Sequence, residues 1–499
     1  MSGQTPPSFV ARLSRFTALN VAQHVVLMAL ALVATPVIYH RLGETAYGIL
    51  AVVTLLASQL SILEFGFGHA TIRWVAQCRG RDDGLGVGRA VATSSWVFLA
   101  TAGVGAGVML FAAEPLVDHF FNVPRDARAT AVAAVQVGSL FFAASVLGNL
   151  ASAVWQGLQR FGTMNLISGV AALLQVLGSI ALVLRGYGVL AVILWSTVLG
   201  LVSLAVNLKG LATPLRGTRW LGPLHPGTLR EMGRFGFLLM LAGAFNQVVV
   251  SGGPLVLGHY VAIGALPFFT VPMSLFQRLN RLGYGLAGAL FPLVAELEGR
   301  GDARTLERLF VSGTHTLLLV GVVAMAPAVL LAGPFLTVWM GPEFSAEAGR
   351  ALELLFAAFA VALTAIPSIE TARGTGRSGL LAGYTGIQAA VVLGGVTLLA
   401  PRWGASGAGA AFLAGHAAGL AFLGLVVGGG AVRRVFPPAT LAVVGAGVGA
   451  TLALLAVTTS PWLRLGAAVG LGAVLAGAAL LWASTADERE VLRRLLRRP

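Results

Sequence analysis

The sequence predicts an all-α polytopic membrane protein of about 14 transmembrane helices, with two six-helix bundles in a pseudo-twofold arrangement and two further C-terminal helices. Hydrophobic residues make up 57% of the 499 residues and charged residues only 10%, whereas a soluble domain carries about 25% charged residues. The mean hydropathy is +0.85. Apolar stretches of about 20 residues, the length that a helix needs to cross a bilayer core, recur along the chain.

Fourteen apolar stretches are separated by short polar loops. They cover approximately residues 16–39, 46–65, 90–112, 129–154, 164–183, 189–208, 237–257, 265–294, 311–338, 351–369, 380–399, 408–427, 441–457 and 467–483. Each is expected to be a helix, because a helix satisfies its own backbone hydrogen bonds without water. No small-residue cleavage site follows the first stretch, which is therefore interpreted as a start-transfer helix.

Lysine and arginine are distributed unequally between alternate loops. With the N-terminus inside, the inner segments hold 24 of the 33 positive residues and the outer loops hold 7, while Arg278 and Arg281 lie within the eighth stretch. Positive residues are retained on the cytoplasmic side of a membrane. The imbalance predicts a multi-pass protein of the bacterial inner membrane with both termini in the cytoplasm.

The net charge of +14 comes from 32 arginines and Lys209 against 19 acidic residues. In a membrane protein this charge is expected to contact anionic lipids, and no nucleic-acid partner is expected. Cys78 is the only cysteine, so the chain has no intrachain disulfide and no CxxC motif. The sequence also lacks HExxH, a Cys/His cluster and GxxxxGK[ST], so neither a metal nor a cofactor is expected.

One long inner linker, which contains Pro214 and Pro223, divides the chain after six stretches. The expected organisation is an N-terminal six-helix bundle at residues 1–210, a cytoplasmic linker at 211–233 and a C-terminal six-helix bundle at 234–430. Transmembrane helices 13 and 14, with a basic cytoplasmic tail, follow at 431–499. Leucine and arginine alternate at helical spacing in the tail, which predicts a helix on the membrane surface.

Short patterns recur on the two sides of the linker at a shift of 217 residues. The matched pairs are Gly157 with Gly374, Arg160 with Arg377, Gly162 with Gly379, and Gly66-Phe-Gly68 with Gly283-Tyr-Gly285. Six stretches separate the members of each pair, so the repeats are predicted to be parallel, and coincidence among the 65 glycines is the alternative. The GxGxxG match that begins at Gly374 lacks a βαβ context and is interpreted as part of this repeat.

Polar residues recur at three- and four-residue steps in the eighth stretch, at Ser274, Gln277, Arg278 and Arg281. This spacing places them on one helix face. An arginine at the centre of a membrane helix costs about 2.5 to 3.5 kcal/mol on insertion scales, so it usually faces a cavity or a partner. Two interpretations are open: the two guanidinium groups bind a pyrophosphate, or both side chains reach from the inner end of the helix to water.

Other polar residues are candidates for a substrate-binding cleft. Gln23 and His24 cluster in the first stretch, and Asn246 and Gln247 precede a Gly-Gly-Pro sequence that should loosen the seventh helix. The 217-residue shift relates Glu64 to Arg281, so we expect these two to meet, with Glu64 releasing an anionic cargo. The alternatives are polar contacts that tie helices together and, for Glu64, an ordinary interfacial position.

Four ionisable residues stand alone in or near other stretches: His315, Glu353, Glu370 and His416. Each is either a proton or cation site or a residue with a polar partner. The longest outer loop, residues 114–128, is too short for a catalytic domain. A transporter is therefore expected and not an enzyme, and the missing outer domain disfavours a membrane polysaccharide polymerase or ligase.

Four motifs occur in order along the first twelve stretches. They are Arg41-Leu-Gly-Glu-Thr-Ala-Tyr-Gly48, Leu63-Glu-Phe-Gly-Phe-Gly68, Gln156-Gly-Leu-Gln-Arg-Phe161 with Asn165, and Arg402-Trp-Gly-Ala-Ser-Gly407. Together they resemble the lipid-linked oligosaccharide and polysaccharide flippases (Wzx-like) of the multidrug/oligosaccharidyl-lipid/polysaccharide exporter superfamily. The resemblance implies two bundles in a V, alternating access and a central cavity with cationic residues, where Arg278 and Arg281 would lie.

The substrate that this resemblance implies is an undecaprenyl-pyrophosphate-linked oligosaccharide, translocated from the cytoplasmic to the outer leaflet of the inner membrane. Gln23 and His24 stand where the lipid II branch has arginines, which favours an O-antigen or exopolysaccharide repeat unit. The implied partners are membrane lipids, a polysaccharide polymerase and glycosyltransferases, and a coupling ion is left open. A cation-coupled multidrug exporter of the same superfamily is the alternative, although arginines would repel cationic drugs.

Overall fold

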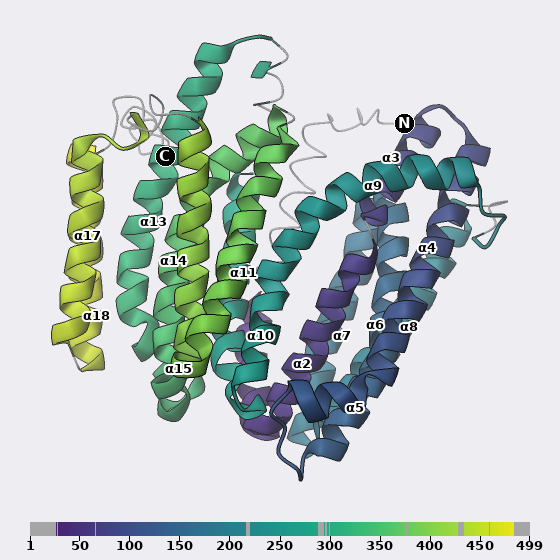
Figure 1. Ribbon diagram of the computed structural model, residues 1–499, viewed down its shortest axis with the longest axis horizontal. Helices are drawn as coiled ribbons and strands as arrows, with labels where there is room; N and C mark the ends of the chain where they lie inside the picture. Colours follow the sequence, from purple (N-terminus) through teal and green to yellow (C-terminus); the bar gives the residue numbers. More distant parts are fainter. Residues whose placement is uncertain are drawn as a thin grey trace, which may run out of the picture. The chain divides into compact units, whose positions relative to one another are not determined.

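The structure is a computed structural model that describes residues 26, 28–64, 66–215, 220–287, 294, 297–298, 300–375, 377–427, 434–458 and 460–483. Nearly all of them are helical, and the bridge between Asn122 and Ala262 is the β-type pairing among them (Figure 1). Ten of the described helices are long and apolar enough to cross a membrane. The predicted fold class, an all-α polytopic membrane protein, is confirmed. The predicted surface helix in the tail lies outside the described residues.

The helices follow the predicted stretches. The first is Met28–Leu42. The next are α2 (Glu44–Leu60) with η1 (Ser61–Glu64), α3 (Phe67–Gly80), α4 (Gly84–Phe111), α5 (Ala113–Pro115), η2 (Leu116–Phe120), α6 (Arg128–Gly157), α7 (Phe161–Leu184) and α8 (Val189–Ala212). The later ones are α9 (Pro226–Gln247), η3 (Val248–Gly252), α10 (Gly253–Tyr260), η4 (Ile263–Ala265), α11 (Pro267–Ala287), α13 (Ala303–Met340), α14 (Pro342–Gly374), α15 (Ser378–Val427), α17 (Pro438–Val457), α18 (Pro461–Ala478) and η5 (Ala479–Ala483).

The long helix α15 consists of two antiparallel helices that join at Gly404, whose backbone is non-helical (φ 52°, ψ −129°). A β-carbon on Gly395 would lie 2.8 Å from the β-carbon of Ala411, and one on Gly419 would lie 2.7 Å from the ring of Tyr384. The stretch before Gly404 and the stretch after it therefore run side by side in opposite directions. The two halves supply the eleventh and twelfth spans, α9–α10 and α11 supply the seventh and eighth, and the total agrees with the predicted 14.

The ninth and tenth helices are longer than predicted. The ninth, α13, begins eight residues before the predicted stretch, and the tenth, α14, begins nine residues before its stretch. Hydropathy marks only the part of a helix that lies in hydrocarbon, whereas backbone hydrogen bonds continue the helix into the polar region. The sequence therefore located these two spans correctly but underestimated the length of their helices.

The chain divides into two compact units by its internal contacts. One holds the chain up to Ala244 together with Ala262–Gly264, and the other holds Phe245–Val261 and the chain from Ala265 onward. The division falls near the end of α9, after the proline-containing linker and not within it. Each unit is described by itself below.

The N-terminal unit is built around α6, which packs against α4 and α8 (Figure 1). Near the end of α6, Trp155 is buried, and its indole N–H donates to Oδ1 of Asn207 on α8 at 2.9 Å. By contrast, α7 buries only Ser179 and Val183 among its 24 residues. It therefore lies at the edge of the unit and leaves one side of α6 and α8 partly uncovered.

The C-terminal unit is built around α14, which packs against α11, α13 and α15. The turn from α13 into α14 lies at Gly341, whose φ of 98° favours glycine. On α11, Phe276 is buried, with its ring 6.2 Å from Phe359 of α14 and 5.4 Å from His416 of α15. The apolar face of α11 therefore packs against α14 and α15 within this unit.

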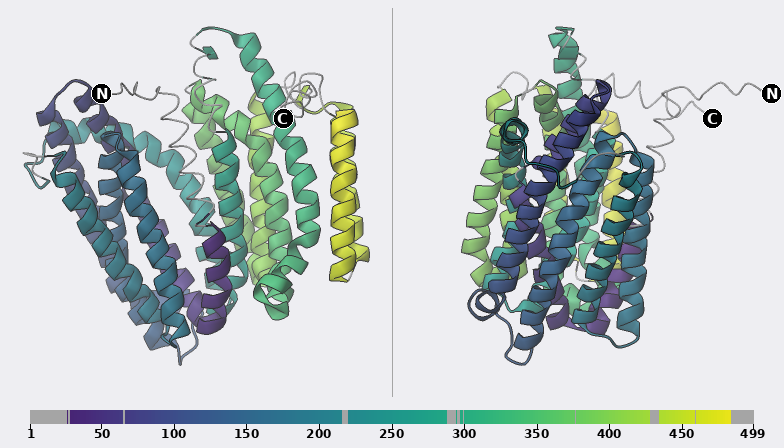
Figure 2. Two further views of the ribbon diagram at one scale, coloured as in Figure 1. Left: turned by 180° about the vertical axis from the view of Figure 1, so that it is seen from behind. Right: turned by 90° about the vertical axis from the view of Figure 1, so that its right-hand side faces the viewer.

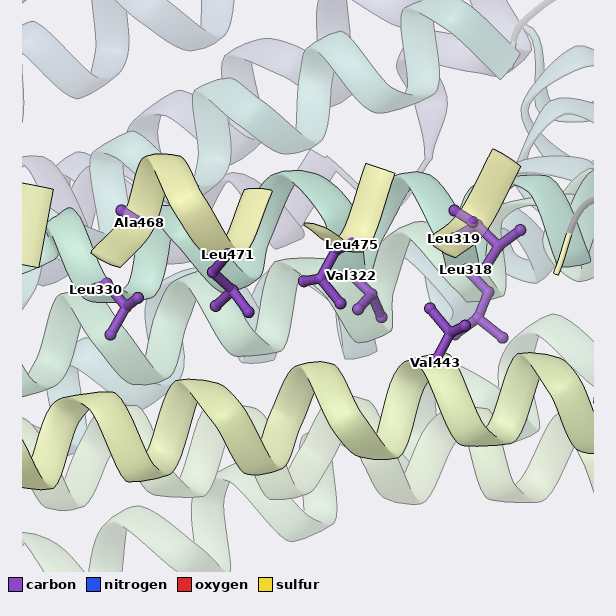
Figure 3. Packing of buried hydrophobic residues seen from close by; sticks show 9 residues of the cluster. Leu318, Leu319, Val322, Leu330, Val443, Ala468, Leu471 and Leu475 are labelled. Carbon is purple, nitrogen blue, oxygen red and sulfur yellow. The ribbon is translucent and has the colours of Figure 1, made fainter. Parts of the chain in front are cut away.

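The last two helices, α17 and α18, form an antiparallel pair at the edge of the C-terminal unit (Figure 2). A cluster of buried aliphatic side chains attaches them to α13 (Figure 3). Leu330 of α13 is fully buried there, together with Ala468 and Leu475 of α18. Because lipid is as apolar as leucine, this cluster stabilises the pair through close packing and not through removal from water.

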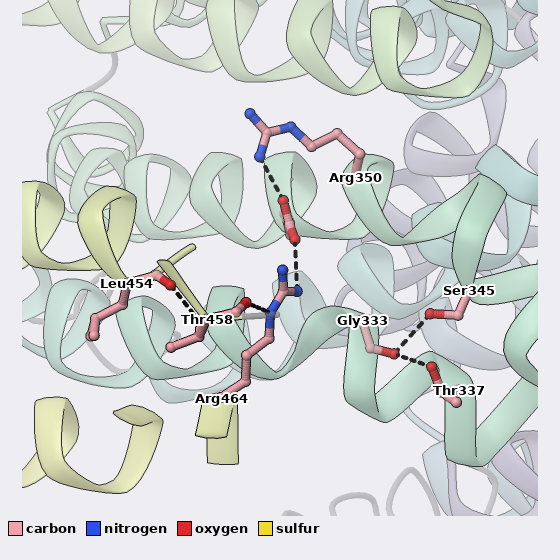
Figure 4. Close-up of polar contacts among 8 residues, drawn as sticks. Gly333, Thr337, Ser345, Arg350, Leu454, Thr458 and Arg464 are labelled. Carbon is pink, nitrogen blue, oxygen red and sulfur yellow. Dashed lines mark hydrogen bonds and ion pairs between the residues drawn. The ribbon is translucent and has the colours of Figure 1, made fainter. Parts of the chain in front are cut away.

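An ionic network also holds α18 to α14 (Figure 4). The carboxylate of Glu353 accepts from Arg350 Nη1 at 2.8 Å and lies 3.7 Å from Arg464 Nη1. Arg464 Nε donates to the carbonyl oxygen of Thr458 at 3.0 Å, at the turn between α17 and α18. The network links the turn to the central helix of the unit through the almost completely buried Glu353.

Helix boundaries repeat at the predicted shift of 217 residues. The helix α6 ends at Gly157 and α14 ends at Gly374, while α7 begins at Phe161 and α15 begins at Ser378. The glycine pair Gly66 and Gly283 differs: Gly66 has a φ of 70° and precedes α3, whereas Gly283 lies inside α11. A β-carbon on Gly283 would lie 2.9 Å from Leu363, so close helix packing requires this glycine and the backbone conformation does not.

The start of α13 is capped by Asp302, whose carboxylate accepts from the Thr305 hydroxyl at 2.6 Å and from the Thr305 backbone N–H at 3.0 Å. These bonds lower the pKa of Asp302 below its usual value. A lowered pKa in the folded state stabilises the cap above the ordinary pKa of about 4, and the stabilisation is lost as the pH falls through the folded-state value.

Hydrogen exchange at the first turn of α13 is therefore expected to show less protection as the pH is lowered below about 4, after correction for the intrinsic exchange rate. The Asp302→Asn variant keeps a capping oxygen without the titrating group, so its protection should not change over this range. An equal decrease in both proteins would contradict the assigned cap.

Candidate functional site

The polar stripe predicted on the eighth span lies on α11. Ser274, Gln277 and Arg278 are half-buried, and Arg281 is exposed. Arg278 Nη1 donates to Ser274 Oγ at 3.3 Å, and Ser274 Oγ donates to the carbonyl oxygen of Val271. The stripe lies away from the Phe276 face that packs on α14. The two arginines thus lie on a helix face other than the one that packs on α14.

The seventh span is interrupted where the sequence predicts that it should loosen. Asn246 and Gln247 end α9, and the next turn, η3, is π-helical. Gln247 Nε2 donates to Ser251 Oγ at 3.0 Å within this turn, and Asn246 is exposed. Single π turns inside α-helices occur frequently at functional sites because they redirect side chains. The two amides therefore remain candidate ligand-binding residues.

Glu64 has a polar partner within the N-terminal unit: Asn149 Nδ2 of α6 donates to Glu64 Oε1 at 2.8 Å. Its predicted meeting with Arg281 of the C-terminal unit stays a prediction. Gln23 and His24 lie outside the described residues.

A polar groove of about 270 Å³ lies between α6, α7 and α8, beside the Glu64–Asn149 pair. None of the described residues that line it is charged. Eight of them carry hydroxyl or amide groups: Ser145, Asn149, Ser152, Ser168, Gln175, Ser196, Ser203 and Asn207. No sequence motif marks this groove, because its residues come from three helices and are up to 66 positions apart, from Phe141 to Asn207.

Hydrogen bonds hold the walls of the groove. Gln175 Nε2 of α7 donates to Ser196 Oγ of α8 at 2.7 Å, and Asn207 Nδ2 donates to the carbonyl oxygen of Ser203. On the other wall, Gly200 of α8 lies close to α6, where its β-carbon would be 3.3 Å from that of Ala144. Contacts of α8 with both α6 and α7 therefore hold the groove in shape.

A second groove, of about 340 Å³, lies between α13, α14, α15 and α17. Its lining is apolar apart from Thr364 and Thr451, whose hydroxyls donate to carbonyl oxygens of their own helices. In a membrane-spanning region such a groove suits a hydrocarbon chain.

A third cavity, of about 780 Å³, lies at one end of the N-terminal unit, and its charged lining residues have mixed signs. Arg79 of α3 donates there to the carbonyl oxygen of Leu158, in the turn between α6 and α7. Arg89 lies 3.8 Å from Asp83, which caps α4. The Gln156–Phe161 motif thus forms a turn that α3 holds in place.

Three of the four isolated ionisable residues have side-chain partners. His315 of α13 shares a hydrogen bond with Thr440 of α17 at 2.8 Å. Glu370 accepts from Arg373 at 2.9 Å, and Glu353 belongs to the network of Figure 4. His416 is buried between phenylalanine rings, and its Nδ1 lies 2.9 Å from the carbonyl oxygen of Phe412. These contacts favour structural roles for all four residues.

Comparisons with known proteins agree with this architecture. Residues 41–348 match the family model described as polysaccharide biosynthesis protein. A curated relative, the uncharacterized membrane protein EpsK of Bacillus subtilis (strain 168), is 24% identical over 338 residues, which are 62% of each chain. The chain thus spans under two thirds of the length of that relative.

Two solved structures have the same fold. The lipid II flippase MurJ in an inward closed conformation has a TM-score of 0.70 at 12% identity, covering 92% of this chain and 97% of that one. An inward-facing multidrug resistance MATE family transporter of the MOP superfamily also has a TM-score of 0.70, at 16% identity, covering 81% and 94%. With the matching family model and the fold together, the chain belongs to the polysaccharide biosynthesis protein family and has the MOP superfamily fold.

Proposed function

We propose that this protein is a flippase that translocates an undecaprenyl-pyrophosphate-linked oligosaccharide from the cytoplasmic to the outer leaflet of the inner membrane by alternating access. The observation that carries the proposal is the α11 stripe, where Arg278 and Arg281 lie on a helix face other than the Phe276 face that packs on α14. Guanidinium groups bind the oxygens of phosphates through paired hydrogen bonds. The stripe is therefore assigned to the pyrophosphate.

Two other features support the same substrate class. The apolar groove beside α17 suits the hydrocarbon part of a lipid-linked molecule. The amides of Asn246 and Gln247, next to the π turn, suit sugar hydroxyls. A lipid-linked oligosaccharide has one group for each of these features: an apolar tail for the groove, a pyrophosphate for the arginines and a glycan for the amides.

The same fold also occurs in a multidrug resistance transporter. Arginines on α11 would repel a cation, whereas they attract a pyrophosphate. A cation-coupled multidrug exporter is therefore the disfavoured alternative. Drug-efflux assays on cells with and without the protein separate the two, because the flippase proposal expects no change in drug accumulation.

The proposal is tested by deleting the gene and measuring lipid-linked saccharides by mass spectrometry. A flippase deletion should increase undecaprenyl-pyrophosphate-linked repeat units in the inner leaflet and decrease the exported polysaccharide. Re-expression of the wild-type chain should reverse both changes. Unchanged lipid-linked saccharides together with unchanged polysaccharide would refute the proposed activity.

A further inference from the structure

We propose that the groove between α6, α7 and α8 is a sugar-recognition site that binds an uncharged sugar ring of the cargo. This inference rests on the proposed function and assigns a site that is separate from the α11 stripe. The groove is lined by hydroxyl and amide groups and by no charged side chain among its described residues. Its chemistry therefore suits a neutral polyol and not a phosphate.

Two of the groove serines are exposed, unlike the polar residues that tie helices together elsewhere in this unit. The pair of Thr71 and Ser94, 2.7 Å apart, is buried. Ser145 and Ser168 are exposed instead, although both lie within membrane-spanning helices. Polar groups at such positions are costly unless they have a polar partner. A ligand with several hydroxyl groups supplies these partners.

The size and shape of the groove fit one sugar ring. Its volume of about 270 Å³ equals the share of roughly nine liquid waters, the scale of a monosaccharide. Because α7 lies at the edge of the unit, the groove opens along one side and a longer glycan can continue beyond it. Phe141 and Ala171 add apolar surface for the C–H face of a ring.

The Glu64 carboxylate has a positioning role in this site. It accepts from Asn149 Nδ2 at 2.8 Å, which fixes the plane of the Asn149 amide at the rim of the groove. An amide held in one orientation loses less conformational entropy when it binds a hydroxyl pair. Glu64 therefore acts through Asn149 and does not contact the sugar itself.

The test uses the full-length protein in nanodiscs and compares its affinity for polyprenyl pyrophosphates that carry no sugar, glucose, galactose or N-acetylglucosamine. The groove variant combines Ser152→Ala, Ser168→Ala and Gln175→Leu. The control variant combines Ser139→Ala, Thr163→Ala and Gln136→Leu, which change hydroxyl and amide residues on the same two helices outside the groove lining. Unfolding temperatures of all proteins are measured in parallel.

The wild type should bind at least one sugar-bearing lipid more tightly than the sugarless lipid. The groove variant should lose this preference by about tenfold, with unchanged affinity for the sugarless lipid. The control variant should behave as the wild type. Equal affinity of the wild type for all four lipids, or a retained preference in the groove variant, would overturn the sugar site. Failure of the wild type to bind any of the lipids would instead count against the flippase function.

Discussion

Replacing both Arg278 and Arg281 with alanine is expected to reduce export of lipid-linked oligosaccharide by about 100-fold or more. Each guanidinium supplies charge-assisted hydrogen bonds worth about 1.5 to 3 kcal/mol to a phosphate group, and a loss of 1.4 kcal/mol is tenfold. Both side chains lie on the face of α11 that does not pack on α14, so the fold should be retained. The measurement is transport of a labelled polyprenyl-pyrophosphate glycan in proteoliposomes.

The matched control is the double variant Arg304→Ala and Arg308→Ala, which removes two exposed arginines from one face of α13. It should transport as the wild type does, because these residues lie outside the stripe. Lysine at positions 278 and 281 keeps the charge but not the paired hydrogen bonds and should give intermediate transport. Undiminished transport in the double alanine variant would remove the stripe from the mechanism.

Replacing Glu353 with alanine is expected to destabilise the C-terminal unit by about 2 kcal/mol. Glu353 is almost completely buried, and its carboxylate faces both Arg350 and Arg464 (Figure 4). Its removal leaves Arg464, whose side chain is only 22% exposed, without its carboxylate partner. The value is smaller than for a fully buried pair because Arg350 is largely exposed.

The measurement is thermal unfolding in detergent, combined with proteolysis between α17 and α18. In Glu353→Ala the unfolding temperature should fall and cleavage at this turn should become faster. Glu343→Ala and Glu347→Ala are the controls, since both residues are exposed on the same helix and should change stability by less than about 0.5 kcal/mol. An unfolding temperature equal to that of the controls would mean that the network does not hold α18.

The fold was predictable because a bilayer restricts it to so few solutions. Each apolar stretch had to become a helix, and the polar Arg402–Gly407 segment correctly marked the hairpin at Gly404 between the eleventh and twelfth spans. The 217-residue shift likewise located matching helix ends at Gly157 and Gly374. By contrast, Gly66 and Gly283 match in sequence for two different structural reasons. Gly66 has a left-handed backbone, which favours glycine, whereas Gly283 allows two helices to pack closely.

The site was predictable only where its residues share one helix. The stripe from Ser274 to Arg281 could be placed on one face because helical spacing fixes which side chains are neighbours. The bond between Glu64 and Asn149 joins residues 85 positions apart, and no local spacing indicates it. The same holds for Glu353 and Arg464.

The sequence by itself determined that the protein lies in a membrane and which segments cross it, because hydropathy is a local property of the chain. Helical periodicity is also local, and it placed Arg278 and Arg281 on one helix face. Tertiary structure alone decided which polar residues have partners and which line the groove between α6, α7 and α8. The physical reason is that a serine in a membrane helix looks the same in sequence whether it bonds to its own backbone, to another helix or to a ligand. Only the packing of the neighbouring helices, which buries some of these hydroxyls and leaves others exposed, distinguishes among the three.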